Sequence, residues 1–366
     1  MKVKEICKFA PKSKIKAGES IDNGDYMFFT SSVDESKRYN DYLFENEGII
    51  MGTGGNATLH YYNGKYAVST DCIVLVPNEI VKCKYLYYFF FANMNVLEAG
   101  FKGAGLKHTN KNYIGNIDVG EIPSTSIQLE IISLFDKITS IIEQRKRELE
   151  LLDNLIKSRF VEMFGDSENN SKKWPVYKLS ELCDIGSSKR IYQEEQTAEG
   201  VPFWRISDLV NMMDTGQAVS GLYISQEKYD ELTERKQVPI EGDILVTSRG
   251  TLGRCYIITD TDKFYFQDGM ISWLSKYKNG ITPLYIKHLF MTSGLIRQID
   301  GMQAGSTVAY LSIAMLKKLD IMLPDSKTQS QFEAFVKQVD KSKVVVQKAL
   351  DEAQTLFDSL MQKYFG

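Results

Sequence analysis

Residues 131–163 read IISLFDKITSIIEQRKRELELLDNLIKSRFVEM. From Ile131 to Met163, steps of alternately four and three residues define a stripe, and eight of its ten positions are apolar. A period of 3.5 residues kept over more than four heptads predicts a coiled-coil helix, because the stripe stays against a partner along its whole length. The alternative is an amphipathic helix that packs on its own domain.

A second helix of the same kind closes the chain. From Phe332 to Tyr364 the same steps meet an apolar or aromatic residue at every position except Lys343. The two helices are predicted to pair antiparallel, because the first leaves one globular segment and the second runs back toward it. Roughly 33 residues at about 1.5 Å each would separate two domains by about 50 Å, or about 15 base pairs of DNA at most.

The chain also repeats itself at an offset of about 201 residues. Pro123, Gln128 and Phe164 match Pro324, Gln329 and Phe365. A period this long indicates two domains of one kind, since solenoid repeats are far shorter. Further matches join residues 48–55 to 242–250, 85–86 to 285–286, and 4–7 to 180–183.

The expected fold class is α/β (α+β): two similar mixed α/β domains separated by a long antiparallel two-helix coiled coil, with pseudo-two-fold symmetry. Runs rich in β-branched and aromatic residues predict strands at 26–30, 48–51, 67–75, 203–206, 244–247, 254–259 and 270–274. The expected boundaries are a first domain at 1–124, a helix at 125–165, a second domain at 172–325 and a helix at 326–366.

Composition indicates a globular protein with two cores. The 366 residues are 43% hydrophobic and 25% charged. The densest apolar run, 85–92, is too short to span a bilayer and predicts a buried helix, and the lysine-rich start carries no signal-peptide pattern. Five scattered cysteines and three isolated histidines argue against disulfides and a zinc site. We expect a cytoplasmic protein with no membrane association and no cofactor of its own.

Charge is uneven along the chain although the net charge is only −3. Lysines crowd residues 2–16, and no acidic residue occurs in 100–115, whereas acids gather in the two helices and in 192–243. This distribution predicts a basic face on each domain, as nucleic-acid binding requires. Solvated lysines on an ordinary surface are the alternative.

The sequence lacks the common catalytic motifs. Residues 52–55, Gly-Thr-Gly-Gly, do not continue into the Gly-Lys-Ser/Thr ending of a phosphate-binding loop. The nucleophile elbow Gly-x-Ser-x-Gly, the zinc pair His-Glu-x-x-His and the methyltransferase tetrapeptide Asn/Asp-Pro-Pro-Tyr/Phe do not occur either. A non-catalytic binding protein is therefore expected.

Two glycine-rich loops recur in both domains, 52–56 with 248–251 and 102–105 with 301–307. Glycine lets a backbone approach a partner closely, and the neighbouring polar and basic side chains are of the kinds that contact phosphates and base edges. Turn formation alone is the alternative reading of these loops.

The motifs together resemble a known family. WPVYKLSEL at 174–182, PFWRISDL at 202–209, GDILVTSRG at 242–250 and GST at 305–307 resemble the target-recognition domain of type I restriction-modification specificity subunits. Residues 321–332, echoed at 122–128, resemble the junction at which that family's conserved helix begins, so the resemblance covers essentially the whole chain. The first domain departs from the pattern: it is some 25 to 30 residues shorter, lacks the Trp-Pro opening, and offers only 24–31 for PFWRISD.

The resemblance implies a non-catalytic specificity subunit that binds double-stranded DNA, each domain reading one half of a bipartite target. It implies two modification (methyltransferase) subunits and restriction (endonuclease/translocase) subunits as partners, which methylate adenine and cleave DNA. A two-headed protein-interaction scaffold and an enzyme with unfamiliar chemistry are the alternatives. The residues expected to contact DNA are Lys189, Arg190, Arg205, Arg249, Thr251, Gln303, Ser306 and Thr307, with Asn56, Lys102, Lys107, His108 and Asn110 in the first domain.

Overall fold

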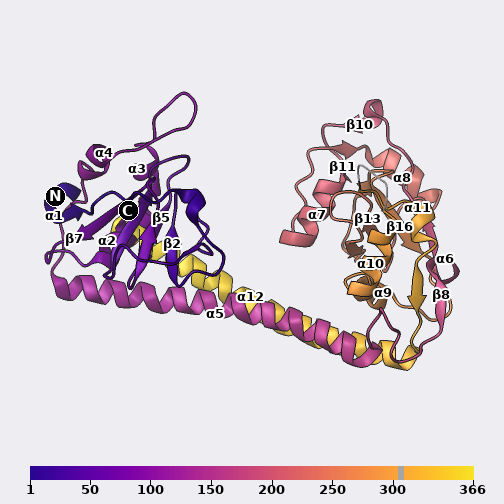
Figure 1. Cartoon of the computed structure of the whole chain (residues 1–366). Helices are drawn as coiled ribbons and strands as arrows, with labels where there is room; N and C mark the ends of the chain where they lie inside the picture. Colours follow the sequence, from indigo (N-terminus) through magenta and orange to yellow (C-terminus); the bar gives the residue numbers. More distant parts are fainter. Residues whose placement is uncertain (304–308) are drawn as a thin grey trace. The chain divides into compact units, whose positions relative to one another are not determined.

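The computed structural model describes residues 1–303 and 309–366. The chain divides into two compact units, unit 1 formed by Met1–Glu148 with Val345–Gly366, and unit 2 formed by Leu149–Val344 (Figure 1). Both chain ends therefore belong to unit 1. No helix in the described part of the chain has an apolar stretch long enough to cross a membrane.

Unit 1 combines two small sheets with four short helices. An antiparallel sheet has the strand order β1-β7-β4-β5, and a second sheet, β3-β2-β6, pairs β2 with β6 in parallel. The elements are α1 (Val3–Ile6), β1 (Cys7–Phe9), η1 (Ala17–Glu19), β2 (Tyr26–Phe29), β3 (Arg38–Tyr39), β4 (Gly48–Gly52), β5 (Leu59–Tyr62), β6 (Tyr66–Val68), β7 (Cys72–Pro77), α2 (Cys83–Ala92), α3 (Met94–Glu98) and α4 (Lys111–Gly115).

Unit 2 repeats this plan with insertions. Its antiparallel sheet is β14-β13-β16-β9, a second sheet, β10-β12-β11-β15, pairs β11 with β15 in parallel, and β17 pairs with β8. The elements are β8 (Val176–Lys178), α6 (Leu179–Leu182), β9 (Asp184–Gly186), η2 (Gln193–Glu195), β10 (Gln196–Thr197), β11 (Val201–Trp204), α7 (Ile206–Thr215), β12 (Tyr223–Ile224), α8 (Gln226–Glu234), β13 (Ile244–Thr247), β14 (Cys255–Ile257), β15 (Tyr265–Phe266), β16 (Ile271–Ser275), α9 (Pro283–Leu289), α10 (Ser293–Gly301), α11 (Ile313–Leu316) and β17 (Asp320–Met322).

The central strands β4 and β13 are buried on both faces, which explains their continuous apolar sequences. In β4, Ile49 and Met51 belong to one apolar cluster and Ile50 to another. In β13, Ile244 and Val246 face one cluster and Leu245 the other. Alternate side chains of a strand point to opposite faces, so one run of residues supplies two cores.

The parallel pair β2–β6 in unit 1 corresponds to β11–β15 in unit 2. Residues 24–31, which match the PFWRISD segment only weakly in sequence, therefore supply the equivalent strand. In unit 1, all of whose residues the structure describes, only β3 lies between β2 and β4, whereas α7, β12 and α8 lie between β11 and β13. The shorter length of the first domain is explained largely by this difference.

Two long helices, α5 (Thr125–Phe164) and α12 (Ser326–Phe365), contribute to both units. A buried glutamine fixes the start of each helix to its globular unit. Gln128 accepts a hydrogen bond from the backbone N–H of Lys82 at 2.7 Å and donates to the carbonyls of Ile80 and Pro123. Gln329 does the same with the N–H of Thr282 and the carbonyls of Gly280 and Pro324. The repeated Pro-x4-Gln spacing thus encodes one helix-anchoring device used twice.

The helices run antiparallel within unit 2. Lys343 of α12 pairs with Asp153 of α5 at 2.7 Å, and further along α5 Phe164 packs on Phe332, which lies earlier in α12. The ion pair also explains how Lys343 is accommodated on an otherwise apolar stripe. In unit 1 the ring of Phe135 packs on that of Phe357 at 5.5 Å. Pairing of the two helices is therefore confirmed. Both helices also pack on the apolar core of each unit to which they contribute.

Three details of the sequence prediction are wrong. The last turns bury Phe164 and Phe365 where the heptad step names Met163 and Tyr364, because a helix of 3.6 residues per turn drifts from a 3.5-residue stripe and its end faces the globular core. The predicted strand 67–75 is two strands, β6 and β7, separated by a turn whose Ser69 and Asp71 side chains are hydrogen-bonded. The predicted strand 203–206 ends at Trp204, because Asp208 caps helix α7 at Arg205.

The stability of unit 2 is expected to fall as the pH falls from 6.5 toward 4. His288 packs on Phe332, and burial, with the charges of Lys287 and Lys343, lowers its pKa to about 4, while Asp153 opposes the shift. As the pH falls, His288 binds a proton in the unfolded chain before it does so in the folded chain. The contribution of neutral His288 to the free energy of unfolding is therefore complete above pH 6.5, and about 3 kcal/mol of it is lost by pH 4. Urea unfolding of the wild type and of His288→Phe at several pH values measures this loss of stability. Free energies of unfolding that fall in parallel for the two proteins would contradict the prediction.

Candidate nucleic-acid interface

In unit 1 the two predicted glycine-rich loops lie against each other. One follows β4 and the other connects α3 to α4. The N–H of Gly55 donates to the carbonyl of Lys107 at 3.0 Å, and the N–H of Thr109 donates to the carbonyl of Thr53 at 3.0 Å. Segments some 50 residues apart in sequence thus form one continuous backbone surface.

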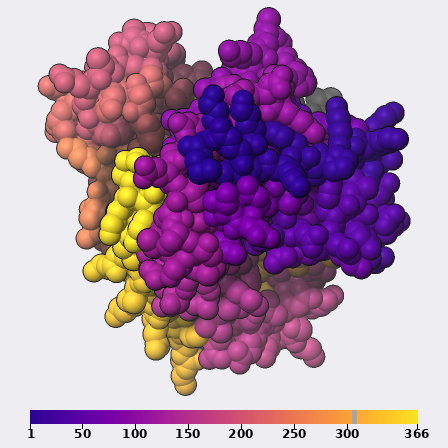
Figure 2. Space-filling view, turned by 90° about the vertical axis from the view of Figure 1, so that its left-hand side faces the viewer, coloured from indigo at the N-terminus to yellow at the C-terminus, as the bar shows by residue number. Residues whose placement is uncertain are grey.

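The loop between α3 and α4 projects from unit 1 (Figures 1 and 2). Lys102 and His108 close its base by exchanging backbone hydrogen bonds at 3.0 and 3.1 Å. The ring of His108 also lies against the other loop, since its Nδ1 is 3.2 Å from the carbonyl of Thr53. All five residues predicted to contact DNA in this unit are exposed: Asn56, Lys102, Lys107, His108 and Asn110.

Asn110 has a structural task as well, because its side-chain oxygen accepts the N–H of Tyr113 and caps α4. Beside it, a hollow in unit 1 is lined by Lys12 and Lys111 together with Thr53 and Asn110. The sequence placed both lysines in basic clusters but did not single them out. Their convergence on one hollow comes from the fold, because Lys12 and Lys111 are far apart along the chain.

Unit 2 arranges its loops in the same way. The N–H of Leu311 donates to the carbonyl of Ser248 at 3.0 Å, which corresponds to the bond between Thr109 and Thr53 in unit 1. The guanidinium of Arg249 lies over the ring of Tyr310, 5.5 Å from its centroid. A cation stacked on an aromatic face is held in a defined plane.

Gln303 closes the second loop of unit 2. Its side-chain oxygen accepts the N–H of Tyr310 at 2.9 Å and its amide nitrogen donates to the carbonyl of the same residue at 3.2 Å. The amide therefore holds the two ends of the loop, and a contact of Gln303 with DNA stays a prediction. Ser306 and Thr307 lie outside the residues that the structure describes.

The other basic residues predicted in unit 2 differ in their partners. Arg190 pairs with Asp268 at 2.9 Å and lines the same hollow as Arg249. Arg205 lies at the start of α7, with its Nε 3.7 Å from Asp208. Lys189 and Thr251 are exposed. Arg190, Arg249 and Tyr310 thus form one basic and aromatic surface, and Arg205 belongs to the cap of α7.

Comparison with known proteins identifies the family. The model of the type I restriction modification DNA specificity domain matches residues 1–151 and 171–353, one match in each half of the repeat. The chain belongs to this family. The match confirms the resemblance seen in the sequence motifs and the predicted role in DNA sequence specificity, which is a targeting role and not a catalytic one.

Two curated relatives of this specificity-domain protein cover most of its length. A type I restriction enzyme specificity subunit of Haemophilus influenzae is 27% identical over 302 residues, which cover 79% of this chain and 73% of the relative. The MjaVIII specificity subunit of Methanocaldococcus jannaschii is 23% identical, covering 87% of this chain and 77% of the relative.

A solved structure has the same fold. The type I restriction-modification S subunit of M. genitalium aligns with a TM-score of 0.65 and 15% identity, over 100% of this chain and 95% of that one. The expected fold class of the specificity-domain protein, two similar mixed α/β units with long helices, is thereby confirmed.

Proposed function

We propose that this chain is the DNA-reading subunit of a type I restriction-modification complex and that each unit reads one half of a bipartite target. The observation that carries this proposal is the recurrence of one device. In both units two loops meet beside the central strand and expose basic and polar side chains, Lys102, Lys107 and His108 in unit 1 and Arg249 and Thr251 in unit 2. Because the two units share one fold but differ in their loop sequences, they are suited to bind two different half-sites.

Two modification subunits and the restriction subunits would supply adenine methylation and cleavage, with this chain selecting the site. The relatives named as specificity subunits of type I restriction enzymes support such an assembly. We place its work in the cytoplasm, where DNA is accessible in a bacterial or archaeal cell. The five buried, free cysteines suit that reducing compartment.

Sequencing of methylated adenines in a host that expresses this chain with its methyltransferase partner tests the proposal. Loss of a two-part methylated motif on deletion of this chain alone is the expected result. A methylome that is unchanged while the methyltransferase stays active would contradict the proposal and favour the protein scaffold. Binding of the purified complex to DNA should also weaken steeply with added salt, since phosphate contacts release counterions.

Arg249→Ala is expected to relax one position of one half-site and to lower affinity for the target about 10- to 100-fold, because an arginine paired with guanine discriminates by about 1–3 kcal/mol. Competition binding with single-base variants of the target, using the complex with modification subunits, measures this. Arg235→Ala is the control, because Arg235 pairs with Glu231 at the end of α8 and belongs to neither loop. Equal discrimination by Arg249→Ala and wild type would remove Arg249 from the interface.

A further inference from the structure

Unit 2 has an ion pair, Arg254 with Asp214, that has no counterpart in unit 1. Arg254 follows the loop after β13, and its carbonyl accepts the N–H of Thr247 at 3.0 Å. In unit 1 the same backbone bond joins Gly52 to Thr58. Thr58 is buried, with 6% of its surface exposed. Thr58 and Arg254 therefore occupy equivalent positions of the two units. Unit 1 has a short buried side chain there, and unit 2 has the long cationic side chain of arginine.

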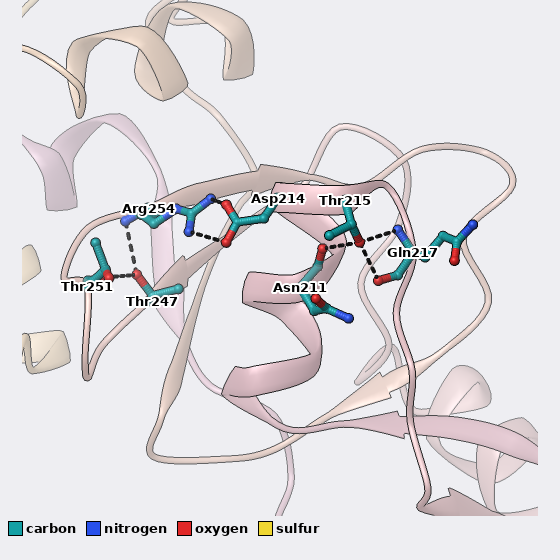
Figure 3. A network of polar contacts seen from close by, with 7 residues as sticks. All are labelled: Asn211, Asp214, Thr215, Gln217, Thr247, Thr251 and Arg254. Carbon is teal, nitrogen blue, oxygen red and sulfur yellow. Dashed lines mark hydrogen bonds and ion pairs between the residues drawn. The ribbon is translucent and has the colours of Figure 1, made fainter. Parts of the chain in front are cut away.

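The partner of this cation comes from the inserted helix α7. One terminal nitrogen of Arg254 lies 3.3 Å from Oδ2 of Asp214, and the other terminal nitrogen donates to Oδ1 (Figure 3). This is the bidentate geometry that fixes the plane of a guanidinium. It also lowers the pKa of Asp214, which stays ionised beside the cation.

Both ends of the pair rest on rigid supports. The backbone N–H of Arg254 donates to the hydroxyl of Thr247, which donates in turn to the carbonyl of Thr251 (Figure 3). On the other side, α7 is fixed by Leu209, which is fully buried in the apolar cluster that also contains Leu245 of β13.

The C-terminal end of α7 is also defined. Gly216 ends the helix with a φ of +71°, and the hydroxyl of Thr215 donates to the carbonyl of Asn211 at 2.8 Å. Asp214 is therefore held on a capped helix, and the direction of the guanidinium is set before any ligand binds. A fixed donor fork costs little to order on binding.

We propose that Arg254 reads a guanine in the half-site bound by unit 2 and that Asp214 is its positioning residue; this rests on the proposed function. Two of the five N–H donors of arginine face the carboxylate, which leaves Nε–H and the outer N–H groups for O6 and N7 of guanine in the major groove. The pair is neutral overall, so a base edge suits it better than a phosphate, which the carboxylate would repel.

The ion pair contributes little to the fold. The side chains of Arg254 and Asp214 are 29% and 52% exposed, and pairs with such exposure add little stability. Variants at both positions should therefore fold, and the melting temperature of each one verifies this. A role in reading DNA predicts a change in base preference at one position, which a purely structural role would not produce.

The test compares wild type with Arg254→Ala, Arg254→Lys and Asp214→Asn, each in complex with the modification subunits, by sequencing methylated adenines. Arg254→Ala and Arg254→Lys should lose guanine preference at one position by about 10- to 100-fold, since lysine keeps the charge but not the fork. Asp214→Asn should show a smaller loss at the same position. Arg297→Ala, on the exposed pair with Glu168, is the control and should leave the motif unchanged.

Three results would overturn the proposal. The first is a methylated motif that Arg254→Ala and Arg254→Lys leave unchanged at every position, and the second is full guanine preference in Arg254→Lys. The third is uniformly weaker binding of the Arg254 variants to all sequences with a shallower salt dependence, which marks a phosphate contact. These outcomes differ from failure of the proposed function, in which deletion of the whole chain leaves the methylome unchanged.

Discussion

Replacing Gln329 with leucine is expected to destabilise unit 2 by about 3–5 kcal/mol, because three backbone groups that bond to its buried amide lose their partners at once. The Gln329 side chain is fully buried and bonds to the N–H of Thr282 at 3.0 Å and to the carbonyls of Gly280 and Pro324. Leucine fills similar space but can satisfy none of these groups.

Tryptophan fluorescence during urea unfolding follows this effect, because all three tryptophans, Trp174, Trp204 and Trp273, belong to unit 2. Gln338→Leu is the matched control on the exposed side of α12 and should change stability by at most about 0.5 kcal/mol. Gln128→Leu should act on unit 1, with its main effect in circular dichroism. A change below about 1 kcal/mol for Gln329→Leu would show that the glutamine is not an anchor.

Phe332→Ala is expected to cost unit 2 about 3–5 kcal/mol, the usual loss for a fully buried aromatic side chain. The ring of Phe332 lies 5.3 Å from that of Phe164 and 5.4 Å from that of Phe160, so the change opens a cavity between α12 and the end of α5. These fixed helices offer little room for the cavity to collapse.

The same fluorescence measurement tests this change. Val344→Ala is the control on α12, since Val344 is 69% exposed and its truncation leaves no cavity. Phe332→Leu should fall between the control and Phe332→Ala. If Phe332→Ala unfolds at the urea concentration of the wild type, the proposed packing of the two helix ends is wrong.

Local pattern was enough for the two long helices and for some of the strands, the central ones among them. The heptad stripe predicted two long helices, and the apolar run at 244–247 is β13 as predicted. The run at 203–206 failed at its end, because the capping contact of Asp208 that starts α7 competes with strand propensity. The stripe failed at the last turn of each helix, where Phe164 and Phe365 turn toward a core that periodicity does not describe.

The candidate site divides in a similar way. The sequence named both loops of each unit, because glycine and polar residues recur at matched positions. It did not pair Asp214 with Arg254, since these residues are 40 positions apart and neither belongs to a recurring motif. It also gave Gln303 no structural task, although its amide closes a loop.

The sequence by itself determined the duplication with its matched glutamines, the two long helices and the family, because each depends on identity or spacing within a short segment. Tertiary structure alone decided which loops meet, which cations are held by carboxylates and which face of each helix end is buried. Those features arise from strand pairing and helix packing between distant segments, and the contact between Arg249 and Tyr310 exists only because β13 and the chain before α11 come together.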